Sequence, residues 1–111
     1  MARKKKTDDT LAFDNAAKTL LANIRFASVD TPIKSITVTS SIPNEGKSTI
    51  ALNLAQAIAT SGKSVLLVEC DMRHRTLANM LGIRHAGGLY AVLSDQMSID
   101  EAVIDTGQPN L

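Results

Sequence analysis

The first third of the chain has hydrophobic residues at the spacing of an amphipathic helix. Asp14 lies near the start of this pattern, where a short acidic side chain can cap a helix. Pro32 follows the pattern, and the residue before a proline avoids helical backbone angles. We therefore predict a helix from about 13 to 28. Its apolar positions are Ala16, Ala17, Leu20, Leu21, Ile24 and Ala27.

Two runs with the character of β-strands flank a second helical pattern. The run at 35–40 is β-branched, and the run at 64–70 is continuously apolar in its middle, as in a strand covered on both faces of a parallel sheet. Between them, residues 48–63 predict a helix that stops at Gly62. The order strand, loop, helix, strand predicts one βαβ unit with a right-handed crossover. The helix has one apolar face, made by Ile50, Leu54 and Ile58.

Shorter elements follow this unit. Residues 75–83 predict a short helix ended at Gly82, and 89–93 predict another after a glycine-rich turn. A last helix starts near Ser98, whose side chain can form a capping box with Glu101. Two strands are too few for a complete sheet. The fold class that we expect is therefore α/β, with parallel strands in an incomplete doubly wound sheet.

The charge balance is too even to indicate a partner for the whole molecule. The chain has 12 Lys+Arg and 11 Asp+Glu, a formal net charge of +1. One Tyr, two Phe and no Trp leave little for base stacking, so we expect no nucleic-acid partner. The basic run at 2–6 predicts a disordered basic and polar tail over 1–12. An electrostatic contact of this run with a membrane surface or an acidic partner is the alternative.

The sequence has the features of a cytoplasmic protein. Cys70 is the single cysteine, so no internal disulfide can form. No apolar run approaches the ~18 residues that would suggest a membrane span. The basic N-terminus is followed by polar residues, whereas a secretory signal needs an apolar segment there.

The segment SSIPNEGKST, residues 40–49, lies between the first predicted strand and the helix after it. Gly46, Lys47 and Ser48 fill the last three positions of the phosphate-loop pattern G-x-x-x-x-G-K-[ST], and Ser41 replaces its first glycine. Such a tripeptide can also occur by chance at a helix start. Because both flanking elements are predicted here, we interpret the segment as the loop of a P-loop nucleotide-binding fold.

Each position of this loop has a chemical role. Successive backbone N–H groups, aided by the positive end of the helix, surround the phosphates. The Lys47 ammonium reaches the β- and γ-phosphates, and the Ser48 hydroxyl ligates Mg²⁺. Gly46 lets the backbone approach without a Cβ, and Asn44 tolerates positive φ. The predicted cofactor-binding residues are Asn44, Glu45, Gly46, Lys47, Ser48 and Thr49.

Two acids end the second predicted strand. Since parallel strands bring their carboxyl ends to one edge of a sheet, Glu69 and Asp71 are expected beside the phosphates. There they could hold Mg²⁺ or its waters and accept a proton from an attacking hydroxyl. The structural alternative is that one acid caps the following helix. We predict ATP and Mg²⁺ as cofactors, Lys47, Glu69 and Asp71 as catalytic residues, and Ser48 and Asp71 as metal ligands.

These segments, in this order, resemble the bacterial tyrosine kinases that control capsular and exopolysaccharide synthesis. The resemblance runs from about Ala16 to Leu111 and includes GGLYAVLSDQMSIDEAV at 87–103. It implies an ATP-dependent protein-tyrosine autokinase that phosphorylates tyrosines of its own tail, mostly between the subunits of a ring. It also implies a membrane chain-length regulator as partner, which would bring a cytoplasmic protein to the inner face of the membrane.

In this resemblance the loop is the Walker A motif and the acidic strand end is the Walker A′ motif, usually Asp-x-Asp. Lys47, Ser48 and Asp71 carry over directly. Glu69 stands where the family usually has the first aspartate, and its side chain is one methylene longer.

Two parts of the family pattern are absent from the sequence. The helix that in the family carries Glu-x-x-Arg-x-x-Arg for ring assembly reads Asn15, Lys18 and Leu21 here. The Walker B strand and the C-terminal tyrosine cluster are expected beyond Leu111. We therefore interpret 13–111 as the N-terminal part of a longer kinase domain.

Three residues that could carry chemistry are expected to have ordinary roles. Tyr90, the single tyrosine, falls in a predicted short helix and is expected to pack. His74 and His85 lack partners at metal-ligand spacing and are expected at the surface.

Two other functions stay open. A partition or division-site ATPase shares the fold, but proteins of that group resemble one another in a lysine five positions before the loop lysine, where this chain has Ile42. The alternative from a different class is a non-catalytic ATP-binding partner of a membrane chain-length regulator.

Overall fold

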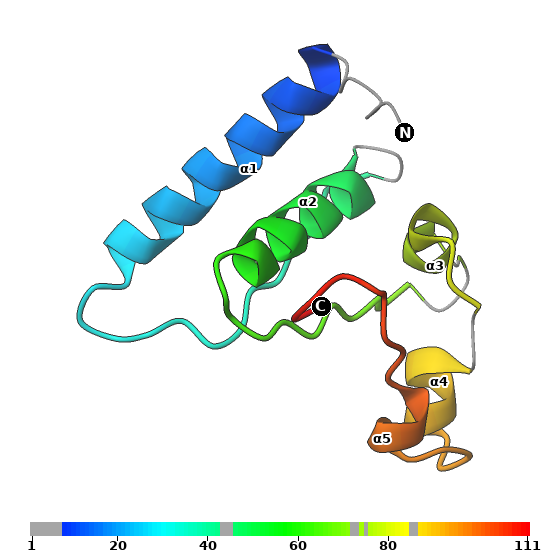
Figure 1. Cartoon of the computed structure of the whole chain (residues 1–111). Helices are drawn as coiled ribbons and strands as arrows, with labels where there is room; N and C mark the ends of the chain where they lie inside the picture. Colours follow the sequence, from blue (N-terminus) through cyan, green and yellow to red (C-terminus); the bar gives the residue numbers. More distant parts are fainter. Residues whose placement is uncertain (1–7, 43–45, 72–73, 75, 85–86) are drawn as a thin grey trace.

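The computed structural model describes residues 8–42, 46–71, 74, 76–84 and 87–111, and this part of the chain contains five helices (Figure 1). The first two are long and lie side by side, and the three others are short. In chain order the helices are α1 Asp8–Ala27, α2 Lys47–Thr60, α3 Thr76–Leu81, α4 Gly88–Leu93 and α5 Ile99–Ala102.

The packing of α1 against α2 forms most of the core. Ala17 and Leu21 of α1 are buried, and so are four residues of α2. Near the C-terminal ends of both helices, Arg25 Nη2 donates a hydrogen bond of 2.8 Å to Ser61 Oγ. The alanines among these buried residues suit ridges-into-grooves packing of the two helices. The buried residues of α2 are Leu52, Leu54, Ala55 and Ala59.

The predicted helix stops are confirmed. α2 ends at Thr60, and Gly62 follows with a φ of 99°, an angle that glycine adopts without strain. α3 ends in a Schellman motif, because the Ile83 N–H donates to the Ala78 carbonyl and the Gly82 N–H to the Asn79 carbonyl.

The first helix is longer than predicted. α1 begins at Asp8, whereas the sequence predicts a start near 13 and a tail over 1–12. α1 has 20 residues, so the helix begins before the point where the apolar periodicity of the sequence becomes visible. The basic run at 2–6 lies outside the described residues.

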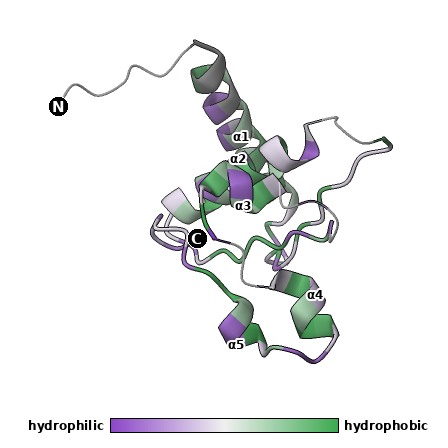
Figure 2. Cartoon of the chain, turned by 90° about the vertical axis from the view of Figure 1, so that its right-hand side faces the viewer, coloured by the Kyte–Doolittle hydropathy of each residue, from purple (hydrophilic) through white to green (hydrophobic). Residues whose placement is uncertain are grey.

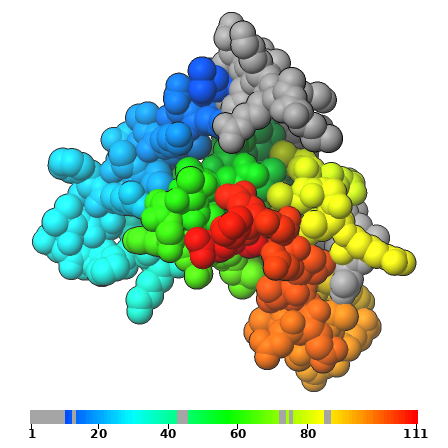
Figure 3. Space-filling model, viewed as in Figure 1, coloured from blue at the N-terminus to red at the C-terminus, as the bar shows by residue number. Residues whose placement is uncertain are grey.

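The last two helices, α4 and α5, contact each other and form a separate lobe (Figure 3). The predicted cap of α5 is confirmed, since Ser98 Oγ accepts the Glu101 N–H at 3.2 Å and also hydrogen-bonds to Glu101 Oε1. The packing role predicted for Tyr90 is wrong. Tyr90 is 60% exposed, because α4 buries the neighbouring Ala91 instead.

Neither predicted strand is present as a strand in the described part of the chain. A strand exists through ladder hydrogen bonds to a neighbour, and segments 35–40 and 64–70 do not pair with each other. Along 65–71, exposed and partly buried residues nevertheless alternate, which is the period of a strand with two faces. The predicted cover on both faces is wrong here, because Leu66 is 62% and Val68 47% exposed.

The C-terminal segment takes a position beside the end of α2 (Figures 1 and 3). The Val65 N–H donates to the Asn110 carbonyl at 2.7 Å, and Asn110 Nδ2 donates to the Ala59 carbonyl at 3.3 Å. Gln108 Nε2 donates to the Gln56 carbonyl at 3.3 Å. This segment therefore joins the start of 64–70 to the last turns of α2.

Among the described residues, the buried side chains are all apolar, and many other apolar residues are exposed. Figure 2 shows that hydrophobic residues occur along every helix. In the described part of the chain, no helix is both long and apolar enough to cross a membrane.

We predict that Asp95→Gly stabilises the fold by about 0.5–1 kcal/mol. Asp95 follows α4 with a φ of 63°, and its N–H donates to the Val92 carbonyl, as in a helix C-cap that favours glycine. Urea denaturation followed by circular dichroism measures the change. Asp100→Gly in the first turn of α5 is the control and should destabilise; a lower midpoint for Asp95→Gly would contradict the prediction.

Candidate functional site

The start of α2 has the backbone geometry of an anion site. Gly46 is the N-cap residue, with φ 79° and ψ 15°, and as a glycine it offers no side-chain acceptor to the first turn. The first helical hydrogen bond runs from the Ile50 N–H to the Gly46 carbonyl at 3.0 Å. N–H groups of the first turn have no acceptor within their own helix, so the oxygens of a phosphate placed here can accept hydrogen bonds from them.

The charges at this helix start favour an anion. Lys47 is the first residue of α2 and is exposed, and the first turn contains no acidic residue. Ser48 and Thr49 are partly buried, and Asn53 Nδ2 donates to the Thr49 carbonyl at 2.7 Å. The Lys47 ammonium and the positive end of a 14-residue helix therefore act in the same direction.

Positive φ at Gly46 is a feature that the sequence reasoning missed. That reasoning assigned positive φ to Asn44, which lies outside the described residues together with Glu45. A Cβ built on Gly46 would meet no atom within 4 Å, so the backbone angle, and not space within the chain, requires glycine. A glycine directly before a predicted helix was the available signal.

Glu69 and Asp71 have different partners. Glu69 Oε1 accepts the backbone N–H of Leu77, in the first turn of α3, at 3.2 Å. Asp71 Oδ2 lies 3.2 Å from His74 Nδ1, and their side chains are 38% and 69% exposed. The expected surface position of His74 is confirmed, whereas His85 lies outside the described residues. The capping alternative considered for these acids thus applies to Glu69.

Segment 64–71 ends on the side of the molecule where α2 begins (Figure 1). It runs there from the C-terminal end of α2, toward α3 (Figure 1). α3 is in contact with α2. The topology therefore brings the end of this segment back toward the loop, as a βαβ unit would.

The donor types suit Mg²⁺. Hydroxyl and carboxylate oxygens are what this ion takes, and it keeps several waters when it also binds nucleotide phosphates. Ser48 and Asp71, the two ligands predicted from the sequence, carry one oxygen donor group of each kind. The described residues contain no cluster of three His, Cys, Asp or Glu.

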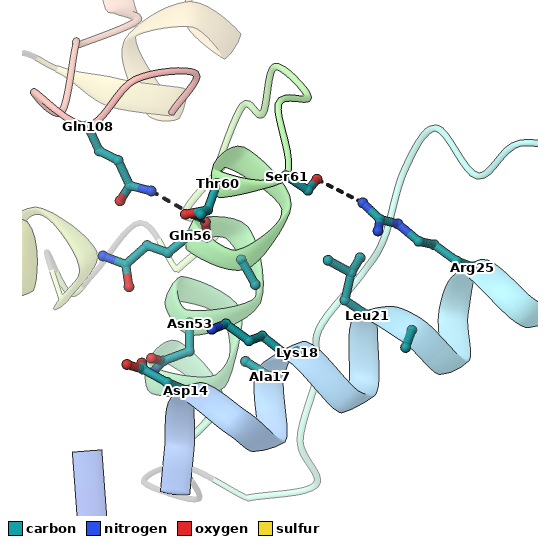
Figure 4. A pocket seen from close by; sticks show the side chains of 12 residues that line it. Asp14, Ala17, Lys18, Leu21, Arg25, Asn53, Gln56, Thr60, Ser61 and Gln108 are labelled. Carbon is teal, nitrogen blue, oxygen red and sulfur yellow. Dashed lines mark hydrogen bonds between the residues drawn. The ribbon is translucent and has the colours of Figure 1, made fainter. Parts of the chain in front are cut away.

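A cavity of about 570 Å³ lies elsewhere, between α1 and α2 (Figure 4). Leu21, at the third position of the ring-assembly pattern, is buried against α2 at its edge, and Lys18 lines it. Of the predicted phosphate-binding residues that the structure describes, Gly46 to Thr49, none lines this cavity. The polar residues around it are Asp14, Lys18, Arg25, Asn53, Gln56, Thr60, Ser61 and Gln108.

The model of one protein family matches residues 36–96. It describes the CobQ/CobB/MinD/ParA nucleotide binding domain (CbiA). The matched range includes the whole segment 40–49 and the two acids Glu69 and Asp71.

Curated relatives with the same segments carry tyrosine-kinase names. The chain is 42% identical over 94 residues to the tyrosine-protein kinase YwqD of Bacillus subtilis strain 168, covering 85% of this chain and 40% of YwqD. It is 34% identical over 103 residues to EpsB of Ralstonia solanacearum, a provisional tyrosine-protein kinase, covering 93% and 13%. It is 30% identical over 95 residues to the tyrosine-protein kinase Wzc of Salmonella typhimurium, covering 86% and 13%. The chain thus spans less than half of each of these relatives. No solved structure gives a significant match.

We predict that Gly46→Ala weakens the binding of a nucleoside triphosphate by at least tenfold, because alanine disfavours a φ of 79° and the loop must change its angle. Gly62→Ala is the matched control, since Gly62 also has positive φ and open space but follows the other end of α2. Both variants should lose about 1 kcal/mol of stability. Isothermal titration would contradict the prediction if both variants bound alike.

Proposed function

The chain belongs to the CobQ/CobB/MinD/ParA nucleotide-binding domain family, and we propose that it binds Mg²⁺-ATP at the start of α2 as part of a bacterial protein-tyrosine kinase. The carrying observation is the helix start at Gly46, an N-cap residue with positive φ and no side-chain acceptor, with Lys47 beside it. In this proposal segments 35–40 and 64–70 are parallel strands of an incomplete doubly wound sheet. The α/β character of the family supports this arrangement.

Each residue of the proposed site has its own role toward ATP. The Lys47 ammonium binds the β- and γ-phosphate oxygens, and the backbone N–H groups from Gly46 to Thr49 donate to the phosphates. Ser48 and Asp71 hold Mg²⁺, which when bound neutralises charge on the transferred phosphoryl group. The Asp71 carboxylate also accepts the proton of an attacking tyrosine hydroxyl.

Protein-tyrosine kinase activity is the function that the relatives support best. YwqD and Wzc are named tyrosine-protein kinases, and the matched segments include the loop and the acidic segment end. MinD and ParA stand in the name of the family, but the position of their group's signature lysine is the exposed Ile42 here. This difference favours the kinase over a partition or division-site ATPase.

The same proposal gives the setting of the protein. Its phosphorylated substrate is a tyrosine-containing protein, including other copies of its own kind, and a homo-oligomer fits that reaction. We infer a cytoplasmic chain that a membrane chain-length regulator holds at the inner face of the membrane, in control of capsular or exopolysaccharide synthesis. A CapB relative from Staphylococcus aureus, over half of whose length this chain covers, supports the capsular setting by its name.

Nucleotide binding is tested with Lys47→Met. We expect the variant to bind Mg²⁺-ATP at least tenfold more weakly than the wild type, because the loss of a charged phosphate contact costs about 1.5–3 kcal/mol. Lys63→Met is the matched control, since Lys63 is an exposed lysine just beyond the other end of α2. Equal affinity of both variants and the wild type in isothermal titration would overturn the proposed site.

Phosphoryl transfer is tested with ATP labelled at the γ-phosphate and a glutamate-tyrosine copolymer as acceptor. We expect Mg²⁺-dependent labelling of tyrosine that Lys47→Met abolishes. Since Tyr90 is the single tyrosine of the sequence, Tyr90→Phe separates labelling of the chain itself from labelling of the acceptor. Tight ATP binding without any tyrosine labelling would instead support the non-catalytic ATP-binding partner.

A further inference from the structure

The hydrogen bond from the Leu77 N–H to Glu69 Oε1 joins two segments that are eight residues apart. It crosses from the end of segment 64–70 to the first turn of α3. A side-chain oxygen that accepts an N–H in the first turn of a helix acts as a helix cap, whichever residue supplies it. Glu69 is therefore a cap from outside the helix.

The local sequence gives α3 little other means of capping. The residue before Thr76 is an arginine, and an arginine side chain has no hydrogen-bond acceptor. The first turn of α3 contains no acidic residue. A carboxylate at this end also interacts favourably with the helix dipole, so the charge of Glu69 supports its role as acceptor.

This bond fixes the two ends of the segment that carries Asp71. Leu77 is only 8% exposed, and α3 contacts α2, so the far end of the bond is anchored in the core. Asp71 lies between Glu69 and Leu77 in sequence and makes its own contact with His74. The position of Asp71 therefore depends on both ends being held.

We propose that Glu69 is a positioning residue that caps α3 and thereby places Asp71, and that Asp71 alone of the two acids serves Mg²⁺. The inference rests on the proposed function, because the role of Asp71 in Mg²⁺-ATP binding is part of it. It also explains the extra methylene of Glu69. An aspartate here would be shorter by about 1.5 Å, one carbon–carbon bond, and its oxygen would not reach the Leu77 N–H.

The test compares three replacements of Glu69 with Asp71→Asn in the intact chain. Glu69→Ala should increase the exchange rate of the Leu77 amide hydrogen roughly fivefold and lower the Tm by roughly 4–8 °C, as loss of a helix cap does. We call the ratio of ATP affinity with Mg²⁺ to ATP affinity without it the Mg²⁺ factor. Glu69→Ala should also reduce this factor about tenfold, because removing a residue that orients a metal ligand has an effect of that size.

Rescue by the conservative variants separates positioning from direct metal binding. Glu69→Gln keeps an acceptor oxygen at the same reach, so we expect it to restore Leu77 protection and most of the Mg²⁺ factor. Glu69→Asp keeps the charge but not the reach, so we expect it to restore neither. Asp71→Asn should lose the Mg²⁺ factor while Leu77 exchanges as in the wild type.

Two results would overturn the inference. One is a Glu69→Gln variant that loses the Mg²⁺ factor as fully as Asp71→Asn, and the other is a Glu69→Asp variant with wild-type Leu77 exchange. If the wild type bound no ATP at all, the proposed function would fail, whereas Leu77 exchange and Tm would still decide whether Glu69 caps α3.

Discussion

The arrangement of this chain depends on α2, against which the other segments pack. Leu52, Leu54, Ala55 and Ala59 of α2 are buried, and α1, α3 and the C-terminal segment all contact this helix. The alanines of the interface allow close approach at little cost in side-chain entropy. The position of the helix start at Gly46, and with it the candidate site, is a result of this packing.

Local sequence patterns predicted the helices well and the sheet poorly. The stops at Gly62 and Gly82 and the cap at Ser98 are confirmed, because each depends on residues within a few positions of one another. A strand depends on a partner that is distant in sequence, and segments 35–40 and 64–70 make no ladder among the described residues. The same limit explains Tyr90, since periodicity cannot say which face of a six-residue helix meets a neighbour.

For the candidate site, the sequence predicted which residues to consider but not how the structure places each one. The pattern around Gly46, Lys47 and Ser48 predicts the helix start that the structure has, although positive φ falls on Gly46 itself. Glu69 and Asp71 look equivalent in sequence because both are acids at a segment end. Their difference arises from Leu77, eight residues after Glu69, whose N–H lies in the first turn of α3 and donates to Glu69.

If the start of α2 binds ATP as proposed, the helix that forms most of the core also forms the nucleotide site, and the nucleotide concentration would then influence how long the folded chain persists. A ligand that binds only the folded state lowers its free energy by about 2.7 kcal/mol at a concentration 100 times its Kd. The core has no fully buried large side chain among the described residues, so such a gain is a large part of its cohesion. In a cell depleted of ATP, the chain would open more often and become a substrate for proteases, which would link the amount of the protein to the energy supply.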